Sequence, residues 1–147
     1  MDTSIWRELE QGAEVRSAEA MHALARRLGE MLPPEAVLAL SGDLGVGKTT
    51  FVQGLATAFG VRERVTSPTF TLYNVHHGAT RTLVHLDAYR LESADQVEDL
   101  LLEDFLVAPY CLAVEWPERI EGWLPPGTLG LRLRILMPGT HHIQLVR

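Results

Sequence analysis

The stretch Gly42-Asp-Leu-Gly-Val-Gly-Lys-Thr-Thr50 decides the fold of this chain of 147 residues. Four of its residues, Gly42, Gly47, Lys48 and Thr49, satisfy the pattern G-x-x-x-x-G-K-[ST]. Glycines at these places let the backbone curl so that successive amides point at the oxygens of a phosphate. A helix that starts there adds the partial positive charge of its N-terminus. The pattern therefore predicts a phosphate-binding loop.

The sequence on either side of the loop has the context that this motif requires. Residues 36–42, AVLALSG, are a short apolar run of strand length, and KTTFVQGLATAFG at 48–60 follows the loop. The second run repeats large apolar side chains at helical spacing, at Phe51, Leu55 and Phe59, and Gly60 ends it. Strand, loop and helix together predict a triphosphate site. The residues expected to form it are Gly42, Asp43, Leu44, Gly45, Val46, Gly47, Lys48, Thr49 and Thr50, with the side chain of Asp43 pointing to solvent or capping the loop.

The lysine of the motif stands out against the composition. Lys48 is the only lysine in the chain, whereas arginine is used twelve times. A compact ammonium at this one position, instead of a planar guanidinium, indicates a specific need for that group. We expect Lys48 to reach the β and γ phosphates and the hydroxyl of Thr49 to complete the shell of a Mg²⁺ ion.

Two acids close apolar strands and are candidates for the same metal. Asp87 ends LVHLD and Glu115 ends CLAVE. Mg²⁺ takes oxygen ligands, and ligands of open α/β sheets sit at the carboxyl ends of strands. Each acid also has a simpler interpretation. Asp87 could make a local cap at the strand end, and Glu115 could pair with Arg119 four residues on.

The segment Thr66-Ser-Pro-Thr69 follows the helix behind the loop. In many phosphate-loop switch proteins a segment at this place carries a hydroxyl that senses the γ-phosphate. Proline between small hydroxyl residues is equally typical of an ordinary turn. From the residues alone, both interpretations stay open for Thr66, Ser67, Pro68 and Thr69.

Hydrophobic periodicity predicts the remaining elements of one domain, residues 1–147. The two predicted helices lie at 17–31, with Ser17 as N-cap, and at 93–106, with Ser93 as N-cap. The apolar stripe of the second helix consists of Val97, Leu100, Leu101 and Phe105. The predicted strands are a hairpin of an extended segment within 64–78 and a strand within 80–91, a buried strand at 110–116, and two antiparallel strands about a Pro138-Gly139 turn. This order predicts an α/β fold, a three-layer sandwich of the P-loop NTPase type with a mainly parallel central sheet and an antiparallel extension.

Composition excludes several classes of function. The formal charge of −6 and pI near 5.5 give no basic face for direct contact with nucleic acid, so any RNA would be contacted by another chain. No apolar run approaches the roughly 20 residues of a membrane span, and MDTSIWRELEQ has acids where a signal peptide has a basic start. We therefore expect a cytoplasmic protein with no membrane partner.

The cysteine and histidines predict no further chemistry. Cys111 lies in the apolar run APYCLAVEW and is expected to be a small buried strand residue. The pairs His76-His77 and His141-His142 are adjacent in predicted strands, so the two members of each pair point to opposite faces and cannot easily bind one metal. The acids Glu98, Asp99, Glu103 and Asp104 are interpreted as a solvated face, with protein docking as the alternative.

Four motifs in one order resemble the bacterial TsaE family, formerly called YjeE, of ATPases in tRNA threonylcarbamoyladenosine biosynthesis. They are GDLGVGKTTF at 42–51, VTSPTFTL at 65–72, HLDAYRL at 85–91 and VEWPERI at 114–120. The resemblance covers nearly the whole chain, and the three motifs after the loop are far more specific than the loop.

The resemblance implies an ATPase that acts with TsaD and TsaB in forming N6-threonylcarbamoyladenosine at position 37 of tRNAs that read ANN codons, resetting the complex between turnovers. By position it implies ATP or ADP on residues 42–50, Mg²⁺ on Thr49 and Glu115, and catalytic roles for Lys48, Asp87 and Glu115. It favours the switch interpretation of residues 66–69, places Trp116 beside the metal ligand, and puts Ser17 near the nucleoside. One feature departs from the family: many members carry Gly-Arg near the C-terminus, where this chain has Gly139-Thr140.

Hydrolysis is the leading mechanism, with Lys48, the loop amides and Mg²⁺ stabilising phosphate charge while water attacks in line. No built-in arginine finger is identifiable, so we expect slow turnover without partners. A small-molecule kinase and a nucleotide-sensing adaptor that does not need hydrolysis remain alternatives. GTP is not expected, because the N-K-x-D guanine signature needs a lysine and Lys48 is the only one.

Overall fold

A seven-stranded sheet in the order β1-β7-β6-β2-β5-β4-β3 organises the molecule. The computed structural model describes residues 4–43, 45–68 and 72–146. The strands are β1 (Ala13–Val15), β2 (Glu35–Ser41), β3 (Tyr73–His77), β4 (Thr82–Asp87), β5 (Tyr110–Glu115), β6 (Leu129–Met137) and β7 (Thr140–Val146). The helices are α1 (Ser4–Gln11), α2 (Ala18–Gly29), α3 (Lys48–Phe59) and α4 (Ala94–Glu98), with two 3-10 helices, η1 (Leu102–Phe105) and η2 (Pro117–Trp123).

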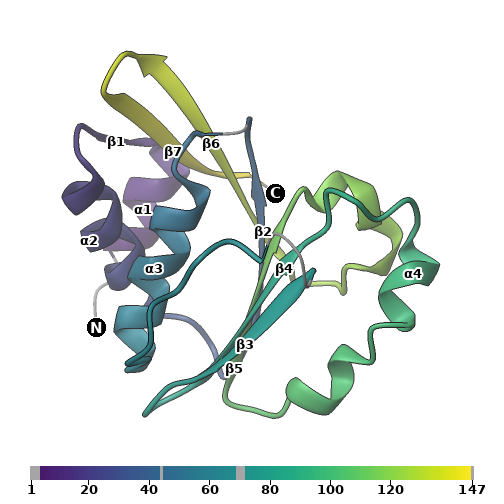
Figure 1. Ribbon diagram of the computed structural model, residues 1–147. Coiled ribbons are helices and arrows are strands. Elements are labelled where there is room, and N and C mark those ends of the chain that lie inside the picture. Colours follow the sequence, from purple (N-terminus) through teal and green to yellow (C-terminus); the bar gives the residue numbers. More distant parts are fainter. Residues whose placement is uncertain (1–3, 44, 69–71, 147) are drawn as a thin grey trace.

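The predicted α/β sandwich is confirmed. Strands β6, β2, β5 and β4 are parallel neighbours, and β3, β7 and β1 extend the sheet by antiparallel pairing at its two edges. Helices α1, α2 and α3 cover one face, and α4 lies on the other (Figure 1). The hairpin of β6 and β7 projects beyond the body of the sheet (Figure 1). The N-terminal α1 and β1 had no counterpart among the elements expected from the sequence.

Alternation along the central strands builds one apolar layer on each face of the sheet. On β4, Leu83 packs into the layer under α1, α2 and α3, whereas its neighbour Val84 packs into the layer under α4 and the 3-10 helices. On β5, Cys111 and Leu112 divide in the same way. Burial raises the pKa of the Cys111 thiol to about 12, as expected for a structural cysteine rather than a reactive one.

The helix predicted at 93–106 is wrong in length. α4 ends at Glu98, and Leu101 adopts a left-handed conformation with φ of 56° before η1 begins. Leu101 is 63% exposed, and Leu102 is buried in its place. Like charges four residues apart, such as Asp95 with Asp99 and Asp99 with Glu103, oppose a continuous helix here. Ser93 precedes α4, but its side chain makes no capping hydrogen bond.

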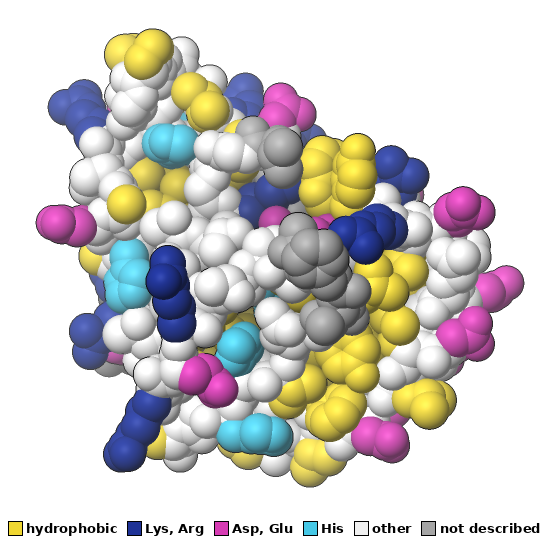
Figure 2. All heavy atoms as spheres, in the orientation of Figure 1, with side chains coloured by type: hydrophobic (Ala, Val, Ile, Leu, Met, Phe, Trp, Pro, Cys, Tyr) yellow, Lys and Arg dark blue, Asp and Glu magenta, His cyan; other side chains and the backbone are white. Residues whose placement is uncertain are grey.

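The acidic residues of this region lie at the surface. Figure 2 shows Asp and Glu side chains along the edge of the molecule that carries α4, next to a band of apolar side chains. The four acids considered from the sequence, Glu98, Asp99, Glu103 and Asp104, are all exposed. This exposure agrees with the solvated face expected from the sequence. In the described part of the chain, no helix has both the length and the apolar character needed to cross a membrane.

Gly54 lets α2 and α3 approach closely, which gives the first testable prediction. A Cβ at Gly54 would lie 2.4 Å from the carbonyl oxygen of His22 and 2.7 Å from Cβ of Ala25. Gly54→Ala must push the two helices apart and should lower the free energy of unfolding by about 1–3 kcal/mol, measured by urea denaturation. Gly122→Ala is the matched control, because a Cβ there meets nothing within 4 Å. Equal stability of the two variants would contradict this account of the helix pair.

Candidate functional site

The carboxyl ends of three parallel strands meet at one edge of the sheet. Asp87, the last residue of β4, is the register partner of Glu115, the last residue of β5. Glu115 in turn pairs with Leu40 on β2, one residue before the strand ends. The glycine-rich loop leaves β2 at this edge and leads into α3. The two acids and the loop are therefore brought together by strand register alone, as the sequence predicted.

Two glycines of the loop lie at positions that other residues would not easily occupy, either because of their φ angle or because a Cβ would clash. Gly47, directly before α3, has φ of 100°, in the left-handed region. Gly42 has φ of 147°, and a Cβ there would lie 2.4 Å from the carbonyl oxygen of Leu133. The start of the loop therefore packs closely against β6, and its end leads into the first turn of α3. Leu44, one of the expected ligand-binding residues, lies outside the described residues.

Lys48 is a buried cation with no acidic partner among the residues that the structure describes. It is 4% exposed, and its Nζ donates to the carbonyl oxygen of Gly42 at 2.7 Å. The same Nζ lies 4.1 Å from the ring centroid of Trp116, a cation–π distance. No carboxylate of the described chain forms an ion pair with it. A buried ammonium needs a counter-charge, so this position suits an anionic ligand.

Beside Lys48 is an open cavity of about 370 Å³ that gathers most of the predicted site. Its lining consists of Gly45, Gly47, Lys48, Thr49, Thr50, Ser67, Asp87, Glu115 and Trp116. The oxygen groups among them include the carboxylates of Glu115 and Asp87 and the hydroxyls of Thr49 and Thr50 on the first turn of α3. This is the hard-oxygen donor set that Mg²⁺ prefers, placed next to a cation and helix N-terminus that suit phosphate. The residues present therefore fit both a triphosphate and its metal.

The side chain of Glu115 does not pair with Arg119, the alternative partner considered from the sequence. Glu115 is 5% exposed, and its Oε2 is 2.5 Å from Nε2 of His85. Arg119 instead places its guanidinium 5.4 Å from the ring centroid of Tyr89. The pairing of Glu115 with Arg119 considered from the sequence is therefore wrong, because the side chain of Glu115 turns inward along the sheet.

For Asp87 the local-cap interpretation is confirmed. Its Oδ1 accepts the backbone N–H of Tyr89 at 3.0 Å, which ties down the turn after β4. The same side chain lines the cavity beside Lys48. A carboxylate has two oxygens and about four acceptor positions, so one hydrogen bond leaves room for a further partner. The cap and a role in the cavity are compatible.

The segment expected to act as a switch enters the same cavity. Its approach is held by two hydrogen bonds: Gln53 Nε2 donates to the carbonyl oxygen of Val65 at 2.9 Å, and Asn74 Nδ2 donates to that of Thr66 at 3.5 Å. Ser67 then lines the cavity, and Pro68 is buried. Thr69 lies outside the described residues. Ser67 and Lys48 therefore line the same cavity.

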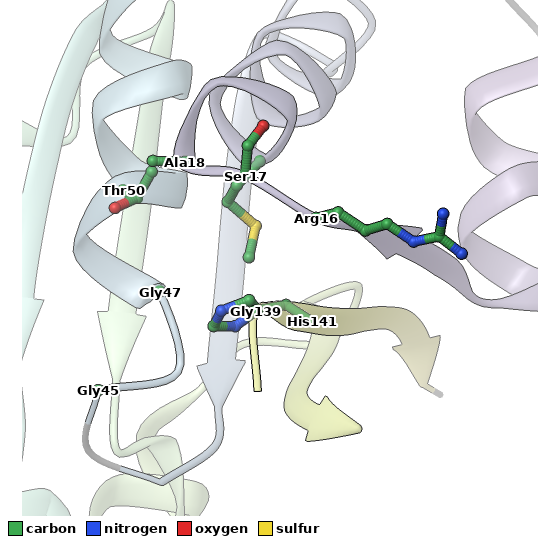
Figure 3. A pocket seen from close by; sticks show the side chains of 9 residues that line it. Arg16, Ser17, Ala18, Gly45, Gly47, Thr50, Gly139 and His141 are labelled. Carbon is green, nitrogen blue, oxygen red and sulfur yellow. The ribbon is translucent and has the colours of Figure 1, made fainter. Parts of the chain in front are cut away.

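A second cavity of about 330 Å³ shares Gly45, Gly47 and Thr50 with the first. Figure 3 shows how its other side chains come from the start of α2 and from the β6–β7 turn. They are Arg16, Ser17, Ala18, Met21, Gly139 and His141. The hydroxyl of Ser17 accepts the N–H of Ala20 at 3.0 Å, so its predicted N-cap role is confirmed. Ser17 also lines this cavity together with Gly45 and Gly47 of the loop.

His141 is a residue of this region that sequence reasoning missed. Its Nδ1 lies 2.9 Å from the carbonyl oxygen of Val46 and, as the only partner able to give a proton, donates to it. This contact joins the C-terminal hairpin to the phosphate loop. The next residue, His142, faces the other way, with Nδ1 3.4 Å from the guanidinium of Arg134. Strand alternation predicted this divergence of the pair, but nothing local in the sequence places His141 against the loop.

Asp43 and Gly42 also face a third hollow, on the side of the loop next to β6. It has a volume of about 510 Å³, and Glu118, Arg132 and Arg134 lie in its wall. The structure therefore places Asp43 away from the cavity that contains Asp87 and Glu115. This agrees with its expected position in the loop outside the metal shell.

Comparisons with known proteins show which family this chain resembles over most of its length. The family model described as threonylcarbamoyl adenosine biosynthesis protein TsaE matches residues 15–142. The chain is 39% identical over 128 residues to the tRNA threonylcarbamoyladenosine biosynthesis protein TsaE of Treponema pallidum, covering 87% of this chain and 94% of that protein. It is 34% identical over 142 residues to the protein of the same name from Aquifex aeolicus, covering 95% and 98%.

A solved structure is also similar over most of the chain. The crystal structure of YdiB from Bacillus subtilis superposes with a TM-score of 0.76 at 30% identity, covering 91% of this chain and 82% of that one. This similarity supports the arrangement of sheet, helices and loop described above.

Proposed function

The chain belongs to the TsaE family of tRNA threonylcarbamoyladenosine biosynthesis, and from that premise we propose that it is the Mg²⁺-dependent ATPase of this machinery. It binds and hydrolyses ATP as a cytoplasmic component that acts with TsaD and TsaB, resetting their complex between turnovers. The product is threonylcarbamoyladenosine at position 37 of tRNAs that read ANN codons. Its net charge of −6 favours contact with tRNA only through those partners.

One observation carries the ATPase proposal. Lys48, Thr49, Ser67, Asp87 and Glu115 come from four separate stretches of sequence and line a single cavity. A buried ammonium, helix N-terminal amides and two carboxylates in one space are the parts that phosphoryl transfer needs. A merely structural strand–loop–helix turn has no need of the two acids.

The residues divide the work of hydrolysis by position. The amides at the start of α3 and the ammonium of Lys48 bind the β and γ phosphates and oppose the charge that develops on them. Thr49 and Glu115 would hold Mg²⁺, which neutralises phosphate charge when bound. Asp87, whose side chain is held by a hydrogen bond from the backbone N–H of Tyr89, orients the attacking water. Ser67 lines the same cavity and senses the γ-phosphate.

Turnover by the isolated chain should be slow. No arginine is among the described residues that line the cavity of Lys48, Asp87 and Glu115. An arginine supplied to such sites accelerates hydrolysis by about 10³–10⁵ in other nucleotide hydrolases. We therefore expect TsaD and TsaB to accelerate or gate the reaction.

A pull-down with and without ATP tests the assignment to this machinery. The tagged chain should retain a TsaD–TsaB complex, and the amount retained should depend on ATP. Failure to retain the complex under either condition would leave an ATPase with no demonstrated place in tRNA modification, and would refute the partner proposal.

Asp87→Asn separates chemistry from binding at this site. Because Asn keeps the shape and an oxygen for the Tyr89 N–H, the turn should persist, while the charge that orients water is lost. We expect turnover to fall about 10²-fold or more, with ADP affinity changed far less, measured by phosphate release and calorimetry. Asp99→Asn, on the exposed acidic face, is the matched control. Native turnover in Asp87→Asn would show that this aspartate is only structural.

A further inference from the structure

His85 occupies a place that the pattern of its strand reserves for an apolar side chain. Alternate residues of β4 face α3, and the one before it in this series, Leu83, is fully buried. His85 is 0% exposed, and its register partner on β5 is the small residue Ala113. A histidine here gives up the apolar packing that leucine would supply. Some other benefit must explain it.

The contact with Glu115 indicates that benefit. A carboxylate only accepts, so the imidazole carries its proton on Nε2 and donates it to Oε2 of Glu115 at 2.5 Å. The opposite nitrogen, Nδ1, is then a buried acceptor, and no group of the described chain pairs with it. The imidazole of His85 therefore supplies a hydrogen-bond donor to the Glu115 carboxylate, while its own Nδ1 has no partner among the described residues. A side chain chosen for stability would not leave that atom unpaired.

We propose that His85 is a positioning residue for the metal site: its hydrogen bond occupies Oε2 of Glu115 and leaves Oε1 of that carboxylate for Mg²⁺. This inference rests on the proposed Mg²⁺-dependent ATPase function. Groups that hydrogen-bond to metal ligands fix the orientation of those ligands and change metal affinity by about 10–100-fold. The side-chain carboxylate of Glu115 has no other hydrogen-bond or ion-pair partner within the described ranges, so its orientation depends on His85.

Three substitutions test the role of the Nε2 donor. His85→Leu fills the space without a donor. His85→Asn keeps a polar group, but its short amide does not extend to the position of Nε2. His85→Gln extends its amide nitrogen toward that position and restores a donor.

We expect the Leu and Asn variants to need about 10–100-fold more Mg²⁺ for half-maximal ATP hydrolysis. Calorimetry should show the same loss in the Mg²⁺-dependent gain of ATP affinity, while ATP affinity in EDTA stays native. His85→Gln should return both quantities close to wild type. The thermal midpoint of His85→Leu should fall, because the substitution removes the hydrogen-bond partner of the buried Glu115 carboxylate.

Val84→Ala is the matched control on the same strand. Val84 is fully buried but faces the opposite apolar layer, so its truncation should lower the thermal midpoint and leave the Mg²⁺ dependence unchanged. A native Mg²⁺ requirement in both His85→Leu and His85→Asn would overturn the inference. So would an equal loss of ATP affinity in EDTA, because His85 would then act on the loop in general. A wild-type protein without Mg²⁺-dependent turnover would instead refute the ATPase proposal, and this inference with it.

Discussion

Lys48→Ala is expected to abolish ATP hydrolysis and to weaken ATP binding by about 10–100-fold, the equivalent of one lost charge-assisted hydrogen bond. The side chain is 4% exposed, and within the described ranges its ammonium contacts the Gly42 carbonyl and the face of Trp116. Those neighbours are neutral, so the positive charge has its main use when an anion arrives. Its removal should leave the fold intact, because no acidic partner in the described chain is stranded.

Two controls make this result specific. Arg26→Ala removes a cation that forms an exposed pair with Glu30 at 3.4 Å, and should leave ATP binding and turnover native. Lys48→Arg keeps the charge but presents a larger planar group where the structure holds a compact ammonium, and should also lose turnover. Calorimetry that finds native ATP affinity in Lys48→Ala would refute the assignment of the loop.

Glu115→Gln is expected to reduce ATP turnover by about 10²–10³-fold while ATP binding in EDTA is retained. Gln keeps the shape of the side chain and an oxygen that can accept from His85, so the packing of this buried position persists. It removes the negative charge of the proposed Mg²⁺ ligand. Phosphate release at saturating ATP, with circular dichroism as a check on folding, measures the effect.

The same variant distinguishes an ATPase from a nucleotide-sensing adaptor. If binding alone matters, Glu115→Gln should support native formation of threonylcarbamoyladenosine with TsaD and TsaB although turnover is lost. Our account predicts that multiple rounds of modification fail. Glu121→Gln, at an exposed position of η2, is the matched control and should behave as wild type. Native turnover in Glu115→Gln would contradict the metal-ligand role itself.

The sequence predicted the parts of the site that depend on local pattern and strand ends. The loop at 42–50 is marked by glycines whose backbone conformations few other residues adopt, and all three of them, Gly42, Gly45 and Gly47, have positive φ. Asp87 and Glu115 end apolar strands, and parallel register then brings them to one edge without further information. The Ser17 cap is equally local, since its acceptor and donor lie three residues apart.

What the sequence could not predict depends on contacts between distant segments. His141 meets Val46 across 95 positions of the chain, and no periodicity encodes that contact. The break after α4 follows from which of three consecutive leucines is buried, and the structure buries Leu102 while exposing Leu101. For His85 a signal did exist: it is the polar residue in the otherwise apolar LVHL run, where strand alternation places an inward side chain.

The most direct test of the central claim is product analysis with ATP labelled at the γ-phosphate. The chain is incubated with Mg²⁺, TsaD and TsaB, and the fate of the label is followed together with ADP. The account predicts ADP and free labelled phosphate in equal amounts, with both lost in Lys48→Ala. Label recovered in a phosphorylated small molecule would identify a kinase, and ATP bound without any turnover would identify an adaptor. Either result would contradict the proposed ATPase.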